Sequence, residues 1–200
     1  MIAYPAGHEP DLWTPDPEEQ TQRFALGWTA ATSTDAPPFI AICMNPSYAA
    51  HDRADKTVNR LIRASTDNGY PGWVMLNLYP ERATDASNLS AYDAGLSAAN
   101  CAAIEDVLTR YGATEVLGAW GGLKHATLRQ AKIDVLNTLD QLSTRLFMFD
   151  GLTSGEPRHP TPRGTPLLMR GEKRYLRRVG HRLVEEPVGG STAESVNASL

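Results

Sequence analysis

The sequence predicts an α/β fold, a three-layer α/β/α sandwich around a central, mainly parallel four-stranded sheet. Two observations lead to this class. The chain contains four short apolar runs of the kind that buried strands have. Longer segments with helical periodicity lie between these runs. Because strands and helices alternate along the chain, the strands are expected to run parallel, with helices on both faces of the sheet.

The four predicted strands are short runs of mostly apolar residues bounded by turn residues or helical segments. They span residues 39–44, 73–79, 115–120 and 145–149. The three predicted helices have apolar residues at intervals of three or four, and they span residues 55–67, 91–111 and 124–142. Asn68-Gly69 ends the first helix and Gly112 ends the second, as glycine does after many helices.

The 200 residues have the length of one ordinary domain. We expect an extended arm over residues 1–20, because its first 17 residues are rich in proline and acidic side chains. A single α/β domain is expected over residues 21–184, and a disordered tail rich in Gly, Ser, Ala and Glu over residues 185–200. No stretch approaches the roughly 18 apolar residues of a membrane span, and the N-terminus lacks the pattern of a signal peptide.

The balance of charge argues against a protein that coats nucleic acid. The formal net charge is -4, whereas such proteins bind through an overall positive charge. Residues 170–178 nevertheless hold five basic side chains and one acidic one, which is either a local basic face or a solvated surface. Cys43 and Cys101 lie in apolar segments, which indicates buried free thiols and a cytoplasmic protein.

Known cofactor motifs are missing from the sequence. The five histidines are scattered, without metal-ligand spacing, and no nucleophile elbow, dinucleotide fingerprint or phosphate-binding loop is present. His51 and Asp52 with Asp55 have the chemistry to hold a cation, but a solvated loop is the favoured explanation. We therefore expect no metal and no cofactor.

The loops after the predicted strands are the place to look for a site, because parallel α/β sheets bind ligands beyond the carboxyl ends of their strands. These loops span residues 44–48, 77–84, 120–122 and 151–164, and they contain Asn-Pro, Gly-Gly and His-Pro dipeptides. Each dipeptide alone is a common turn signal. Their position at one edge of the sheet favours a shared pocket.

The side chains of these loops suit a pyrimidine base. Asn45 and Asn77 each offer a donor and an acceptor for the edge of the ring. His159 can donate a hydrogen bond to a developing anion or act as a general acid or base. Tyr48 and Tyr79 have flat rings that can stack on a base. The alternatives are that Asn45 caps a helix and that both tyrosines belong to the core.

Arginines near the same loops suit a phosphate backbone. The candidates in the loops are Arg82, Arg158 and Arg163, and those in the basic C-terminal segment are Arg174 and Arg177. The alternative for Arg82 is an ion pair with a neighbouring carboxylate, and the alternative for the C-terminal arginines is a solvated face.

Three of the loops resemble motifs of the uracil-DNA glycosylase superfamily, most closely its mismatch-specific uracil/thymine branch. Residues 44–50, Met-Asn-Pro-Ser-Tyr-Ala-Ala, are similar to the first motif of that branch. Residues 77–84, Asn-Leu-Tyr-Pro-Glu-Arg-Ala-Thr, are similar to its second segment. His159-Pro160-Thr161-Pro162 resembles the His-Pro-Ser-Pro motif of the wider superfamily. The resemblance implies the glycosylase fold.

The chain is more similar still to a bacterial and phage family, the domain of unknown function 1643. The family pattern is Asn-Pro-Ser, Asp-x-Thr, Asn-Leu, Arg-x-Thr, Trp-Gly and Gly-x-Pro-x-His-Pro, and it occurs here in that order over residues 23–168. Asp55-Lys56-Thr57 fills its second element.

The resemblance to the glycosylases implies a role for each matched residue. Asn45 would position the water that attacks the sugar C1′, Asn77 would read the base, and His159 would stabilise the leaving pyrimidine anion. The segment Thr161–Gly164 would enter the minor groove and contact the DNA backbone. Ser47 stands where these enzymes often have glycine, beside the base. Asn45 in place of a carboxylate makes a poor general base, so slow turnover is expected.

These observations lead to one main hypothesis and two alternatives. The main hypothesis is a DNA glycosylase-like enzyme that recognises a flipped pyrimidine base and cleaves its N-glycosidic bond or otherwise alters the base. The first alternative is a catalytically silent module that recognises a base in DNA. The second is an N-glycosidase or transferase that acts on free nucleosides or nucleotides. DNA or a nucleobase-containing ligand is the expected partner of a monomer that binds no membrane.

Overall fold

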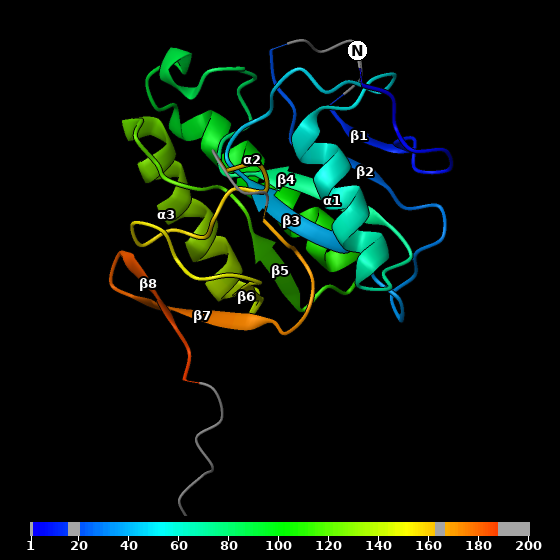
Figure 1. Cartoon of the computed structure of the whole chain (residues 1–200). Helices are drawn as coiled ribbons and strands as arrows, with labels where there is room; N and C mark the ends of the chain where they lie inside the picture. Colours follow the sequence, from blue (N-terminus) through cyan, green and yellow to red (C-terminus); the bar gives the residue numbers. More distant parts are fainter. Residues whose placement is uncertain (1, 16–20, 163–166, 188–200) are drawn as a thin grey trace, which may run out of the picture.

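The computed structural model describes residues 2–15, 21–162 and 167–187 (Figure 1). Its helices are α1 (Lys56–Asp67), α2 (Ala94–Arg110) and α3 (Ala126–Gln141), with a short 3-10 turn η1 (Ala86–Asn88). Its strands are β1 (Leu12–Thr14), β2 (Ala25–Trp28), β3 (Phe39–Cys43), β4 (Trp73–Asn77), β5 (Glu115–Gly118), β6 (Arg145–Met148), β7 (Arg174–Val179) and β8 (Arg182–Glu185). All seven helices and strands that the sequence predicts are confirmed, with ends that shift by at most three residues.

The predicted sandwich around a mainly parallel four-stranded sheet is wrong. The sheet has eight strands in the order β1-β2-β4-β3-β5-β6-β7-β8. Strands β3, β4, β5 and β6 run parallel to one another, but β1 and β2 extend one side of the sheet antiparallel, and β7 and β8 extend the other side in the same way. The sheet is therefore mixed, with the parallel strands at its centre.

The four strands that sequence reasoning missed lack the continuous apolar run of a strand buried on both faces. β1 has three residues and β2 has four, one of them a glycine. β7 and β8 carry arginines that are exposed or half-buried between their apolar residues. β1, β7 and β8 are partly exposed to solvent, so their pattern is weaker than that of central parallel strands, whereas β2 is buried but short.

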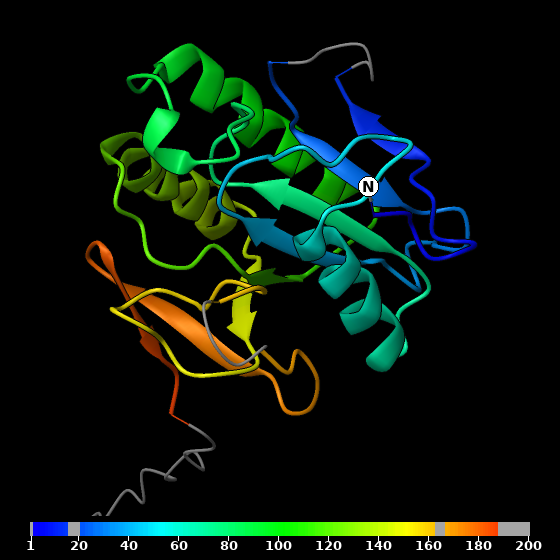
Figure 2. The ribbon, with the colours of Figure 1, turned by 45° about the horizontal axis from the view of Figure 1, so that its top comes forward.

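Alternate residues of the central strands pack against helices on the two faces of the sheet. On β3, Phe39, Ala41 and Cys43 lie in one apolar cluster with residues of α1. Ile40 and Ile42 lie in a second cluster with residues of α2 and α3. Figures 1 and 2 show the same arrangement, with α1 on one face and the other two helices opposite. This alternation explains why β3 reads as a continuous apolar run.

Part of the segment interpreted as an N-terminal arm lies within the fold. Leu12–Thr14 forms β1 and pairs with β2, and Ile2 forms an isolated bridge with Ala54. At the other end of the chain, Glu185 closes β8, and residues 188–200 of the expected tail lie outside the described residues. Among the described helices, none has the length and apolar character needed to cross a membrane.

The connections change direction at the carboxyl ends of two neighbouring strands. β3 and β5 are adjacent, but the helix after β3 is α1 and the helix after β5 is α3, which cover opposite faces. Loops therefore leave these two strands in opposite directions. Open α/β sheets bind ligands at such a switch point.

Candidate functional site

A cavity of about 490 Å³ lies beyond the carboxyl ends of β3 and β4. Its lining comes from five segments: Arg23 just before β2, the end of β3 with the loop that follows, the start of α1, β4 with the loop after it, and the His-Pro loop. Four of the predicted site residues line this cavity, namely Asn45, Ser47, His159 and Thr161. The structure therefore brings these four residues together at this edge of the sheet.

Asn45 is fixed by the backbone of the loop after β4. Its Nδ2 donates to the carbonyl oxygens of Ala83 at 2.8 Å and Pro46 at 3.1 Å. Because carbonyl oxygens only accept hydrogen bonds, the amide nitrogen must be the atom on that side. The Oδ1 of Asn45 forms no hydrogen bond with the described residues, so it is an acceptor that a water or a ligand can use.

His159 is a neutral hydrogen-bond donor in this cavity. Its Nδ1 accepts a hydrogen bond from the backbone N–H of Thr161 at 3.1 Å, and the Thr161 hydroxyl lies 3.0 Å from the same nitrogen. Since the backbone N–H only donates, the proton of the neutral ring is on Nε2. Burial lowers the pKa of His159 below its ordinary value of 6.5, and the charge of Asp55 opposes this shift without cancelling it.

The His-Pro loop rests directly on two glycines of the β5 end. Gly121 has φ +74°, and a Cβ there would lie 3.0 Å from the Cβ of His159. Its N–H also donates to the carbonyl of Pro157 at 2.8 Å. A Cβ on Gly118 would lie 2.9 Å from the ring of Pro157. Only glycine permits this close approach, which sets the position of His159 relative to β5.

Glu156 fixes the same loop from the other side. Its Oε2 accepts a hydrogen bond from the indole N–H of Trp120 at 2.7 Å, and its Oε1 forms an ion pair with Lys132 of α3. Both partners are buried or nearly so. His159 follows Glu156 by three residues, so these contacts anchor the chain just before the histidine.

Arg23 places a positive charge in the wall of the cavity. The residue is fully buried, and its Nη1 donates to the carbonyl of Ala49 at 2.6 Å. Among the described residues, no carboxylate forms an ion pair with it, and its Nε has no partner. Burial lowers its pKa to about 10, and the charge of nearby Arg82 acts in the same direction. Buried charges are normally paired, so this cation is unusual.

Asp55 brings a carboxylate into the same cavity. It is 6 % exposed, and its Oδ1 accepts the backbone N–H of Val58 at 2.9 Å as the N-cap of α1. Its other oxygen forms no hydrogen bond with the described residues. The charge of Asp55 acts on both Arg23 and His159 and raises the pKa of each against the effect of burial.

Three residues that the sequence assigned to base binding do not line the cavity. Asn77 is fully buried within β4, where its Nδ2 donates to the carbonyl of Arg23 at 3.4 Å. Tyr79 is fully buried beside α3, and its hydroxyl accepts the backbone N–H of Asp93 at 3.1 Å. Tyr48 is an exposed side chain outside the lining.

Most of the predicted phosphate ligands have protein partners instead. Arg82 donates to the carbonyl of Ala49, Arg158 pairs with Asp150, and Arg174 binds Glu185 through two nitrogens. Arg177 is exposed, but β7 runs antiparallel to β6, so it lies toward the opposite edge of the sheet from the cavity. Arg163 lies outside the described residues. Arg174 and Arg177 also point to opposite faces of their strand, since side chains alternate.

Three charged residues of the cavity were not among the predicted site residues, namely Arg23, Asp55 and Asp85. Asp55 had a visible signal, because an aspartate directly before an apolar helical repeat is a strong N-cap candidate that fixes the side chain in space. Arg23 had none, since its burial depends on contacts with Ala49 and Met75, which are distant in the sequence. Arg23 and Asp55 come together in the cavity only through the tertiary fold.

Cys43 also lines the cavity but is a poor nucleophile. Burial raises the pKa of its thiol far above the ordinary value, so the reactive thiolate is disfavoured. Both cysteines are free thiols. Among the described residues, no three His, Cys, Asp or Glu side chains gather as metal ligands.

The fold and the cavity define an α/β protein with a mixed sheet and a polar site at the carboxyl edge of its parallel strands. The chain belongs to the family described as "protein of unknown function (DUF1643)", whose model matches residues 23–161. The matched span begins at Arg23 and ends at Thr161, so it contains all the residues that line the cavity. No curated protein and no solved structure matches the chain significantly.

Proposed function

We propose that the protein hydrolyses the N-glycosidic bond of a pyrimidine nucleotide, natural or modified, whose base is flipped out of DNA into the cavity beyond β3 and β4. The observation that carries this proposal is the pairing of a buried cation, Arg23, with a neutral histidine donor, His159, in one cavity. Together these groups favour a ligand that becomes negatively charged during the reaction.

The size of the cavity supports a ligand of this class. Its volume of about 490 Å³ falls within the roughly 300–1,000 Å³ of sites that hold small organic molecules. Asn45, Ser47 and Thr57 add polar groups to the lining, as expected for a site that orients a planar ring with several hydrogen-bonding atoms.

The leaving group is the base itself. When the bond between C1′ and the ring nitrogen breaks, its electron pair passes to the base and leaves an anion. The Nε2–H of His159 can donate to this anion, and the buried charge of Arg23 lowers its energy further. A neutral donor stabilises the anion without having to transfer a proton.

The opposite charge develops on the sugar, where the transition state resembles an oxocarbenium ion. The carboxylate of Asp55 can stabilise this positive charge and accept a proton from the attacking water, while the Oδ1 of Asn45 accepts a hydrogen bond from the same water. The water oxygen bonds to C1′, and the proton held by Asp55 passes to the released base or to solvent. Asn45 alone is a poor general base, and the carboxylate of Asp55 takes over the acceptance of the proton.

DNA as the source of the base is supported by the likeness of two loops to uracil-DNA glycosylase motifs. These are residues 44–50 and 159–162, and each supplies residues to the cavity. A pyrimidine within a duplex cannot reach such a cavity unless it leaves the stack, so base flipping is part of the proposal.

The test is an excision assay on labelled oligonucleotides that carry uracil, a G·T mismatch or 5-hydroxymethyluracil, with alkali cleavage of the abasic product. The expected result is cleavage of at least one substrate by the native protein and at least a hundredfold slower cleavage by His159→Ala, since removal of one anion-stabilising donor costs about that much. If a folded protein binds these oligonucleotides and cleaves none, the enzyme is excluded and a recognition module remains.

A further inference from the structure

A second cavity lies beside the first and runs along α1. It has a volume of about 750 Å³, between α1 and the chain at residues 167–169. Thr161 lines both cavities, so the two are neighbours through one residue of the His-Pro loop. We call this second cavity the α1 groove.

One wall of the α1 groove is basic. Lys56, Arg60 and Arg63 line it, and their spacing of four and three residues places them on one side of the helix. A single carboxylate, Asp67, lies in the same wall and pairs with Arg63 at 3.5 Å. The side chain of Arg63 is 78 % exposed, so this pair is weak and leaves the cation available.

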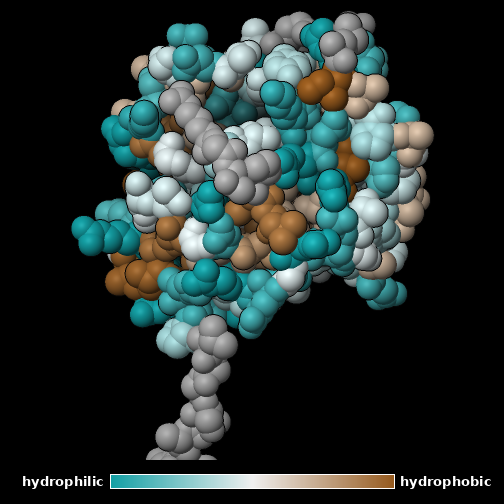
Figure 3. Space-filling view, viewed as in Figure 1, coloured by the Kyte–Doolittle hydropathy of each residue, from teal (hydrophilic) through white to brown (hydrophobic). Residues whose placement is uncertain are grey.

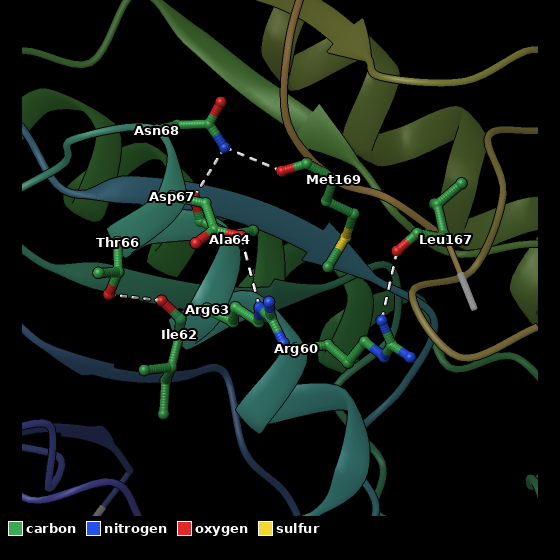
Figure 4. A network of polar contacts seen from close by, with 9 residues as sticks. All are labelled: Arg60, Ile62, Arg63, Ala64, Thr66, Asp67, Asn68, Leu167 and Met169. Atoms are coloured by element: carbon green, nitrogen blue, oxygen red, sulfur yellow. Dashed lines mark hydrogen bonds and ion pairs between the residues drawn. The ribbon is translucent and has the colours of Figure 1, made fainter.

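The opposite wall is held in place by hydrogen bonds to α1. Asn68 Nδ2 donates to the carbonyl oxygens of Ala64 at 2.7 Å and Met169 at 2.8 Å. Arg60 Nη1 reaches the carbonyl of Leu167 at 3.4 Å. Figure 4 shows these bonds joining the segment to the helix. The groove is therefore formed before any ligand arrives.

The floor and rim of the α1 groove are partly apolar. Leu168 lines it with 62 % of its surface exposed, and Leu167 and Met169 flank it. Figure 3 shows hydrophilic side chains over α1 beside an apolar group where residues 167–169 pass. A basic wall opposite the exposed side chain of Leu168 suits a chain whose phosphates pair with the cations while a sugar or base packs on the apolar surface.

We propose that the α1 groove binds the phosphodiester backbone of the strand that carries the flipped nucleotide, next to that nucleotide. This inference rests on the proposed function, because it assigns the groove to the same strand that delivers the base. Charge complementarity is the argument for DNA: the whole chain has a net charge of -4, yet three cations against one carboxylate line this groove. These cations are Lys56, Arg60 and Arg63, which sequence reasoning did not assign to phosphates.

The experiment compares two triple variants with the same change of charge. The groove variant is Lys56→Gln, Arg60→Gln, Arg63→Gln, and the control is Arg110→Gln, Arg177→Gln, Arg182→Gln, which removes three exposed arginines from α2, β7 and β8. Fluorescence anisotropy measures the Kd for a labelled single-stranded 12-mer that carries one central target pyrimidine, over a series of salt concentrations.

The groove variant is expected to bind at least tenfold more weakly at low salt. Its slope of log K against log salt should be shallower by about 2, because three lost phosphate contacts each contribute about 0.7 on a single strand. The control should bind as the native protein does. Native-like binding by the groove variant, or an equal loss in the control, overturns the proposal.

Two further readouts separate a folding defect from a binding defect, and this proposal from the proposed function. The single variant Arg63→Gln changes an exposed side chain and should lower affinity two- to fivefold with an unchanged Tm. In the excision assay the groove substitutions should raise KM and leave kcat nearly unchanged.

If the native protein binds DNA through the α1 groove but excises no base, the groove assignment stands and the proposed hydrolysis fails. If the native protein excises bases while the groove variant binds DNA normally, the proposed hydrolysis stands and the groove assignment fails.

Discussion

Asp55 combines a structural task with a chemical one. One carboxylate oxygen caps α1, and the residue also lines the cavity with Arg23 and His159. Asparagine is as good an N-cap as aspartate but carries no charge. Asp55→Asn should therefore change the free energy of unfolding by less than about 0.5 kcal/mol, while the single-turnover rate of excision falls by about 10²- to 10⁴-fold.

Asp93 provides the matched control for this substitution. It is the N-cap of α2, where its Oδ1 accepts the N–H of Leu96 at 2.8 Å, and it does not line the cavity. Asp93→Asn should leave both stability and excision unchanged. Equal losses of activity in the two variants, or full activity in Asp55→Asn, would remove the assigned role of Asp55.

The protonation of His159 predicts the pH dependence of excision. Because burial lowers its pKa below 6.5, the unfolded chain binds this proton more readily than the folded chain does. The stability that neutral His159 contributes is therefore complete above the unfolded value and is lost as the pH falls from 6.5 toward the lower folded value. Excision should likewise hold its rate through pH 6.5 and decline only below it.

The measurement is a pH–rate profile of the native protein and His159→Gln between about pH 5 and 8. Glutamine keeps a donor but does not titrate, so the decline on the acid side should be absent from its slower profile. An acid decline that persists unchanged in His159→Gln would assign the titration to another group.

Arg23 predicts a conflict between stability and function. Its guanidinium is fully buried without an ion pair among the described residues. Burying a charge without an ion pair costs free energy through lost solvation, and an apolar side chain at the same place does not carry that cost. Arg23→Met should thus keep or raise the Tm and abolish excision. A variant that unfolds, or one that remains active, would contradict this account of the residue.

At the scale of elements, the contact between the end of β5 and the His-Pro loop determines where His159 lies. Gly121→Ala adds a Cβ 3.0 Å from that of His159 at a φ of +74°. Left-handed backbone costs a residue with a Cβ about 1–2 kcal/mol, and relief of the contact moves the histidine. The variant should lose about this much stability and excise at least tenfold more slowly, as measured by chemical unfolding and the excision assay.

Gly122 is the adjacent control, because a Cβ there meets nothing within 4 Å and its φ is not in the left-handed region. Gly122→Ala should be close to native in both measurements. If Gly121→Ala is also close to native in both measurements, the position of the His-Pro loop does not depend on Gly121.

The elements that could be predicted from the sequence are those buried on both faces. β3 and β4 are buried at every residue, so their apolar runs have no polar interruption until Asn77. β2 is nearly as buried, but a Cβ on its Gly27 would lie 2.6 Å from the carbonyl of Trp73. The close packing of β2 against β4 requires a glycine at this position. Because glycine interrupts the apolar run of β2, the sequence did not predict this strand.

At the scale of the whole molecule, the location of the site was predictable and much of its composition was not. The carboxyl edge of parallel strands follows from alternation along the chain, and in the structure Asn45, Ser47, His159 and Thr161 lie together at that edge. Asn77 still belongs to β4 and pairs with Cys43 of β3, so it lies inside the sheet and not in the loop that follows the strand. Arg23 reaches the cavity because β2, the strand that follows it, pairs antiparallel with β4. No local sequence pattern predicts this pairing.

The central claim is that the cavity beyond β3 and β4 holds a pyrimidine base. The most direct test is an NMR titration of the ¹⁵N-labelled protein with uracil, thymine, cytosine and 5-hydroxymethyluracil. The account predicts that at least one of them shifts the backbone amides of residues 43–47 and 159–161, prolines excepted, and that Arg23→Met abolishes the shifts. Shifts that cluster elsewhere, or none with any of the four bases, would contradict it.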